Sequence, residues 1–211
     1  MRAFVSFTLV TVLCVSGQPS AYSAEPDALL RHIEAEWEGK VVRDQAVPER
    51  PVIGIVFHCT SRVPDEVIEQ LVAFPQLRTL GLIGGQRLTD KGLEHIGKLT
   101  NLETLEIRNR TLTADGLKHL TKLPNLKSLL LWGVTLNKQS GETLEGLKAL
   151  EVLELRSVTV STEALSSIKK LKNLKQIDGH DCDGAFTSED DVRKALTLRI
   201  VDKTQDWDAA T

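Results

Sequence analysis

Aromatic residues are scarce in this sequence, and charges of one sign never gather in a long run. Only 4% of the 211 residues are Phe, Trp or Tyr, so leucine and other aliphatic residues must supply the core. The 26 Lys and Arg residues nearly balance the 29 Asp and Glu residues, and no basic stripe of the kind that binds nucleic acid is visible. The G-x-S-x-G, H-E-x-x-H, Walker-type and C-x-x-C motifs are also missing. We therefore expect neither an enzyme nor a nucleic-acid-binding protein.

The first 24 residues have the pattern of a signal peptide. Arg2 gives the positive start, residues 3–15 give the apolar stretch, and A-Y-S-A (21–24) gives the small residues of a cleavage region. The apolar stretch is too short to span a bilayer comfortably. Cleavage after Ser23 and cleavage after Ala24 both fit. The mature chain would carry 25 basic and 29 acidic residues. We expect it to be secreted or periplasmic, with no membrane span.

One fifteen-residue pattern occurs twice, as LTDKGLEHIGKLTNL (88–102) and LTADGLKHLTKLPNL (112–126). Each copy leads into an L-x-x-L-x-L signature, and successive signatures start 24 or 25 residues apart. A catalytic motif has no reason to recur at a fixed interval, but a unit that buries its apolar face against copies of itself does. The signature residues are Val52/Ile55/Phe57, Leu77/Leu80/Leu82, Leu102/Leu105/Ile107, Leu126/Leu129/Leu131 and Leu150/Leu153/Leu155.

Each repeat is predicted to form a short strand, a turn and a helix of about two to three turns. The apolar residues Leu93, Ile96 and Leu99 have helical spacing. The residues placed to cap the helices are Thr89, Thr113, Asn137 and Ser161. Neighbouring strands lie about 4.8 Å apart and packed helices about 8–10 Å apart, so a stack of such units bends toward its strands. An arc results, with a parallel sheet on the concave side and helices on the convex side.

This pattern resembles the leucine-rich repeat family over residues 52–182, in the helical class that is similar to ribonuclease-inhibitor-like and short bacterial secreted proteins. The resemblance implies an α/β fold, a curved leucine-rich repeat solenoid. Many members carry a polar residue three places after the last strand leucine. That place holds Gly85, Arg110, Val134, Val158 or Cys182 here, so an asparagine ladder is not expected.

The repeats, residues 50–184, need a cover at each end because a solenoid exposes its core there. Residues 25–49 are predicted to form a helix with apolar Leu29, Leu30, Ile33 and Trp37, followed by a strand at Val41 and Val42. Residues 185–211 are predicted to form a C-terminal cap and tail. Once Cys14 leaves with the signal peptide, Cys59 and Cys182 remain. They lie about five strands apart, too far for a disulfide, and Cys182 should turn toward the core.

Four short patterns resemble motifs that hold a ligand or accept a modification. G-L-I-G-G (81–85) does not lead directly into a helix, so it is expected to shape a turn rather than hold phosphate. His95 and His119 take the same helix position in adjacent repeats, and we expect them on a solvated flank. H-D-C-D-G (180–184) lacks the first ligand of a calcium loop. Asn109 starts a glycosylation sequon, which matters only in a host that glycosylates exported proteins.

Residues that alternate with the signature leucines are expected to point outward and to line up in columns across the strands. Arg78, Glu103, Lys127, Glu151 and Lys175 form a column of alternating charge that should stabilise the register. The second column is Gly81, Glu106, Leu130, Glu154 and Asp178. The third column is Ile83, Arg108, Trp132, Arg156 and His180.

An exposed Leu130 and Trp132 are thus expected in the middle of the arc, with an Arg and a Glu on either side. Trp and Arg are the side chains that most often dominate binding energy at interfaces. The predicted partner-binding residues are Trp132, Leu130, Arg108, Arg156, Glu106 and Glu154. The sequence therefore favours a non-catalytic, monomeric scaffold that binds a protein through its concave face, with no cofactor and no metal. A carbohydrate- or cell-wall-binding module is the alternative, although it would need more aromatic residues on this face.

Overall fold

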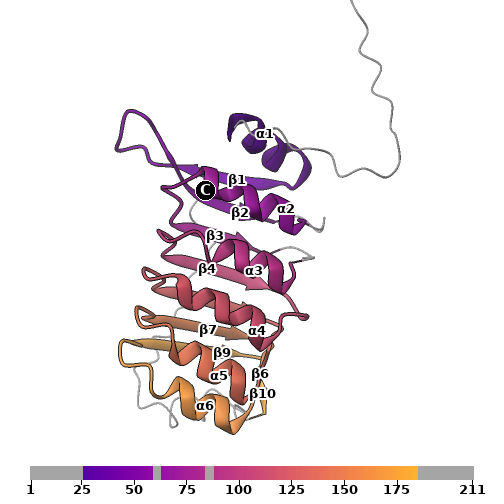
Figure 1. The fold of residues 1–211 in the computed structure, drawn as a ribbon, viewed down its shortest axis with the longest axis vertical. Coiled ribbons are helices and arrows are strands. Elements are labelled where there is room, and N and C mark those ends of the chain that lie inside the picture. The colour runs from indigo at the N-terminus through magenta and orange to yellow at the C-terminus, as the bar shows by residue number, and fades with distance from the viewer. Residues whose placement is uncertain (1–25, 59–62, 84–87, 185–211) are drawn as a thin grey trace, which may run out of the picture.

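The computed structural model describes residues 26–58, 63–83 and 88–184. The predicted signal peptide, Cys59 and the segment from residue 185 onward lie outside the described residues, so the predictions made for them stay predictions. The described units are stacked along one axis, with the strands on one side and the repeat helices on the other (Figure 1).

Seven strands form the main sheet, in the order β1-β2-β3-β4-β5-β7-β9. Neighbours from β2 to β9 are parallel, and β1 pairs antiparallel with β2. The strands are β1 (Gly39–Arg43), β2 (Val52–Phe57), β3 (Thr79–Leu82), β4 (Thr104–Arg108), β5 (Ser128–Trp132), β7 (Val152–Arg156) and β9 (Gln176–His180). A second, parallel sheet joins three two-residue strands: β6 (Thr135–Leu136), β8 (Thr159–Val160) and β10 (Asp183–Gly184).

The repeat helices begin where the sequence places their caps. Those of seven or eight residues have the predicted length of about two turns, whereas two are shorter. The caps Thr89, Thr113, Asn137 and Ser161 each accept a hydrogen bond from a backbone N–H of the first turn. The helices are α1 (Pro26–Glu36), α2 (Asp65–Gln70), α3 (Asp90–Ile96), α4 (Ala114–Leu117), α5 (Lys138–Glu145) and α6 (Thr162–Ile168). The 3₁₀ turns η1 (Leu71–Ala73) and η2 (Lys118–Lys122) continue α2 and α4. Such short helices are unstable alone, so their stability comes from packing against the sheet and each other.

One continuous core runs the length of the stack between the sheet and the helices. The middle residue of each signature is fully buried there. These residues are Ile55, Leu80, Leu105, Leu129, Leu153 and, in the last copy, Ile177. The sheet register aligns them in one row across the strands. The described units thus form an α/β leucine-rich repeat solenoid, as the sequence predicts.

Side chains at the starts of the helices link adjacent repeats. The carboxylate of Asp65 accepts hydrogen bonds from the backbone N–H and the hydroxyl of Thr89. Asp90 accepts the same two hydrogen bonds from Thr113, one repeat later. Glycines at 92 and 116 leave room for the two aspartates, because a Cβ at Gly92 would overlap Asp65 and one at Gly116 would overlap Asp90. Helix capping and repeat stacking therefore use the same side chains.

The turns between helix and strand carry a second link between repeats. The side-chain amides of Asn101, Asn125 and Asn173 each donate to a backbone carbonyl of the preceding repeat, over 2.8, 3.0 and 2.7 Å. An asparagine ladder is therefore present, but on the turns before the strands and not at the place where the family pattern puts a polar residue. Its signal in the sequence is the Asn-Leu pair at 101–102, 125–126 and 173–174.

At the N-terminal end, α1 and β1 cover the first repeat (Figure 1). Leu29, Leu30, Ile33 and Trp37 are buried, as the sequence predicts. Val41 packs partly against the core, whereas Val42 is exposed. None of the helices in the described part of the chain is long and apolar enough to cross a membrane.

Candidate partner-binding surface on the strand face

The side of the main sheet that points away from the helices, here called the strand face, carries the predicted columns. The register pairs Glu106 with Leu130 and Leu130 with Glu154. It also pairs Arg108 with Trp132 and Trp132 with Arg156. The predicted residues therefore lie side by side on β4, β5 and β7.

Trp132, at the end of β5, is half-buried between two arginines. The guanidinium carbon of Arg108 lies 4.0 Å from the centroid of the indole ring, and that of Arg156 lies 5.8 Å from it. At exposed sites a cation–π contact contributes roughly 0.5–1 kcal/mol. The arginines come from the neighbouring strands on either side, so the sheet itself fixes the position of the indole.

Leu130 is not exposed as predicted: only 8% of its surface is accessible. Strand neighbours lie about 4.8 Å apart, and the longer side chains of Glu106 and Glu154 flank Leu130 on both sides. Alternation along a strand predicts which way a side chain points, but not how far its neighbours cover it. Leu130 therefore forms the apolar floor of the strand face.

Glu154 and Arg156 of β7 form an ion pair with each other. Oε1 of Glu154 accepts from Nε of Arg156 over 2.6 Å and from an Nη over 2.5 Å. The Glu154 side chain is only 17% exposed, so water screens the pair less than it would on an open surface. The charges of this strand largely satisfy one another.

Glu106 and Arg108 of β4 take the same two register positions but do not pair. Neither side chain makes a hydrogen bond or an ion pair with a described residue, and Arg108 instead stacks on Trp132. Glu106 is half-buried. Burial raises the pKa of Glu106, the charge of Arg156 opposes that rise, and the charge of Glu154 adds to it. The carboxylate thus loses part of its hydration, and no described residue donates a hydrogen bond to it that would offset this cost.

The charged column of the strand face forms two of the ion pairs that its alternating charges predict. Lys127 pairs with Glu103 and Lys175 pairs with Glu151, each over 2.8 Å. The hydrogen bond from Lys127 lowers the pKa of Glu103. Because these side chains are mostly exposed, such pairs contribute little beyond fixing the register.

His95 is not on a solvated flank, as the sequence suggested, but 96% buried, with 4% of its surface accessible. The equivalent Thr143 and Ser167 are buried too, so this position faces the seam between adjacent helices. Nδ1 lies 3.3 Å from Nζ of Lys98, and Nε2 has no hydrogen-bond partner among the described residues. His119 is half-buried. The described residues contain no group of three His, Cys, Asp or Glu side chains placed to hold a metal ion.

Asn109, the first residue of the sequon, is buried. Its Nδ2, the atom that a glycan would occupy, donates to the backbone carbonyl of Leu88 over 2.6 Å. Its Oδ1 accepts from the backbone N–H and the hydroxyl of Thr111. The folded chain therefore does not present this sequon for glycosylation. Cys182 packs partly against the core, in the predicted direction.

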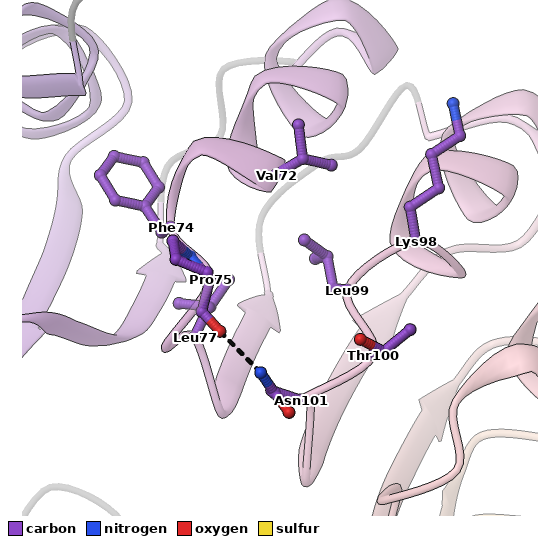
Figure 2. A pocket seen from close by; sticks show the side chains of 8 residues that line it. All are labelled: Val72, Phe74, Pro75, Leu77, Lys98, Leu99, Thr100 and Asn101. Atoms are coloured by element: carbon purple, nitrogen blue, oxygen red, sulfur yellow. Dashed lines mark hydrogen bonds between the residues drawn. The ribbon is translucent and has the colours of Figure 1, made fainter.

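A cavity of about 130 Å³ lies between the first two repeats, near the ends of η1 and α3 (Figure 2). Its lining includes Val72, Phe74, Leu77 and Leu99, and the side-chain amide of Asn101 donates a hydrogen bond to the carbonyl of Pro75 at its edge. Pockets that hold drug-sized ligands measure about 300–1,000 Å³. The cavity is therefore too small for such a ligand, and the strand face remains the better candidate surface.

No protein-family model and no curated protein matches the sequence. Among solved structures, internalin C2 of Listeria monocytogenes is 19% identical, with a TM-score of 0.49, over 71% of this chain and 70% of its own. A leucine-rich repeat protein of Leptospira interrogans is 22% identical, with a TM-score of 0.39, over 67% of this chain and 39% of its own. The ectodomain of the receptor kinase SOBIR1 from Arabidopsis thaliana is 17% identical, with a TM-score of 0.40, over 74% of this chain and 93% of its own. Likeness of this size says nothing of what the strand face binds.

Proposed function

We propose that this leucine-rich repeat chain is an exported, non-catalytic scaffold that binds a protein partner through its strand face. The observation that carries the proposal is the position of Trp132. It lies half-buried between Arg108 and Arg156, two residues along β5 from Leu130, of whose surface only 8% is accessible. Immobilised Trp and Arg side chains lose little further entropy on binding, which is why such groups dominate interfaces. Export rests on the signal-like pattern of residues 1–24.

The test is capture of exported proteins on the mature chain, compared with a Trp132→Ala variant. We expect capture to weaken about tenfold or more, because truncating an interface anchor costs about 2 kcal/mol or more. The melting temperature should change little, since the lost cation–π contact is worth only roughly 0.5–1 kcal/mol. The matched control is Val72→Ala, which removes an exposed apolar side chain away from the strand face.

Equal capture by the wild type and the Trp132→Ala variant would refute the proposal. A large stability loss in that variant would show that Trp132 serves the fold instead. The carbohydrate alternative predicts that Trp132 is needed for binding to isolated cell-wall polysaccharide rather than to protein. Mass spectrometry of the mature chain tests export and distinguishes cleavage after Ser23 from cleavage after Ala24.

A further inference from the structure

The strand face contains two Glu-x-Arg pairs in equivalent register positions, on either side of β5. We call Glu154/Arg156 the closed pair, because its members bind each other at 2.5–2.6 Å. We call Glu106/Arg108 the open pair, because neither member makes an ion pair or a hydrogen bond among the described residues. The sequences are nearly identical, E-I-R and E-L-R, so the difference lies in how the side chains are used.

Arg108 is prepared to bind an anion. Its guanidinium lies over the ring of Trp132, and a stacked guanidinium still presents its N–H groups around its edge. Arg156, by contrast, already directs Nε and an Nη at Glu154. A carboxylate that approaches the strand face therefore finds the donors of Arg108 unoccupied among the described residues, whereas at Arg156 Nε and one Nη already face Glu154.

Glu106 is prepared to bind a cation. Its carboxylate is half-buried beside Leu130. Burial raises the pKa of Glu106 more than the charge of Arg156 lowers it, and the charge of Glu154 adds a smaller rise. A Lys or Arg from a partner would supply the missing compensation. Residues two apart on a strand are separated by about 6.6 Å, so the open pair presents a negative and a positive site at about that distance.

We infer that the open pair recognises two charged side chains of the protein partner. Arg108 binds an acidic side chain, and Glu106 binds a basic one. An extended segment with the two charges two residues apart has the required spacing. The column of Glu106, Glu154 and Asp178 disfavours a polyanion such as nucleic acid, and a neutral glycan would leave both charges unpaired. This inference rests on the proposed function of the strand face.

The probe is a displayed library of random peptides, selected on the mature chain. Peptides that bind wild type but not the Trp132→Ala variant are kept as strand-face binders. We expect them to be enriched in an acidic and a basic residue two positions apart. Each is then synthesised with its acid changed to Asn or its base changed to Gln, and the dissociation constants are measured against wild type and variants.

The variants Arg108→Gln and Glu106→Gln separate the two sites by double-mutant cycles. With wild type, each neutral peptide should bind about five- to tenfold more weakly than its charged parent, equivalent to roughly 1 kcal/mol. Arg108→Gln should abolish the preference for acid over Asn and keep the preference for base over Gln. Glu106→Gln should do the reverse. The matched control, Arg156→Gln, can lower overall affinity but should keep both preferences.

The failures of the inference and of the proposed function differ. Strand-face binders without charge enrichment, or cycles in which neither variant removes its preference, would overturn the inference while the proposed function stands. If Arg156→Gln removes the preference for acid, the anion site has been assigned to the wrong arginine, and the inference is again wrong. A library that yields no Trp132-dependent binder counts against the proposed function itself, and the inference fails with it.

Discussion

The two sides of the main sheet carry the same repeat but follow different rules. Toward the helices, the same contacts recur from unit to unit. Each strand of the main sheet from β2 to β9 has a buried Leu or Ile, and three of the turns have an Asn whose side chain donates to the preceding repeat. On the strand face, equivalent positions differ from unit to unit, and the two Glu-x-Arg pairs behave differently. Contacts that recur stack the repeats, whereas the departures from the repeat give individual units of the strand face a surface of their own.

The largest expected effect compares two neighbouring leucines on β5. Leu129 points into the core and is fully buried, whereas Leu130 lies on the strand face. Leu129→Ala should lower the free energy of unfolding by about 2–5 kcal/mol, because it removes core contacts and leaves a cavity. Leu130→Ala should cost clearly less, because its space opens to solvent. Urea unfolding of both variants measures the difference. Equal losses would mean that the strand-face leucine is as much a part of the core as its neighbour.

An intermediate effect is expected where α5 meets α6. A Cβ at Gly141 would lie 2.5 Å from the Cα and 3.0 Å from the carbonyl oxygen of Ala164. Backbone atoms cannot rotate away, so Gly141→Ala should lower the free energy of unfolding by about 1–3 kcal/mol despite its better helix propensity. Gly146→Ala, at the residue that follows α5, is the control. Its closest contact is the methyl group of Thr121, an exposed side chain, and the backbone oxygen next to it, that of Thr143, belongs to the same helix end rather than to a neighbouring helix. If Gly141→Ala unfolds at the same urea concentration as wild type, the seam between these helices is looser than described.

The smallest effect contrasts two glutamates on β4 and at its entry. The pKa of Glu106 is raised above its ordinary value of 4.5, so the folded state binds its proton more readily than the unfolded state. Its charge therefore costs stability at neutral pH, and the cost disappears as pH falls to 4.5 and below. Glu106→Gln should raise the free energy of unfolding at pH 7 by less than about 1 kcal/mol, with no gain in acid.

Glu103→Gln should show the opposite sign. The pKa of Glu103 is lowered by Lys127, so its charge stabilises the folded state at neutral pH, and that contribution is lost as pH falls through the folded pKa. Because Glu103 is largely exposed, the loss at pH 7 should be slight. Chemical unfolding from pH 7 to pH 4 measures both curves. Changes in unfolding free energy of the same sign for both variants would contradict the distinction between Glu103 and Glu106.

The spacing of the leucines was enough to predict the fold, because burial of one apolar row per repeat leaves few other arrangements. The caps Thr89 and Thr113 and the register of Trp132 were predicted for the same reason: they recur at the repeat length. The charged column Glu103–Lys127 followed from that register as well.

Properties that depend on neighbouring side chains could not be predicted. The burial of Leu130 depends on the size of the residues across the strands, and the burial of His95 depends on how closely adjacent helices meet. The open and closed pairs have almost the same sequence, so their difference follows from which partner each arginine reaches, Trp132 or Glu154. These are packing outcomes, and a period alone does not determine them.

The contact of Trp132 with arginines from both neighbouring strands also limits how the gene can change length. Duplicating or deleting a 24-residue unit before β4 or after β7 would alter the size of the protein and leave Arg108, Trp132 and Arg156 adjacent. The same change between β4 and β7 would separate an arginine from the indole, even though every leucine stayed in its place. Adding or removing a repeat therefore keeps the contact of Arg108, Trp132 and Arg156 only where the change falls outside the units that carry β4, β5 and β7.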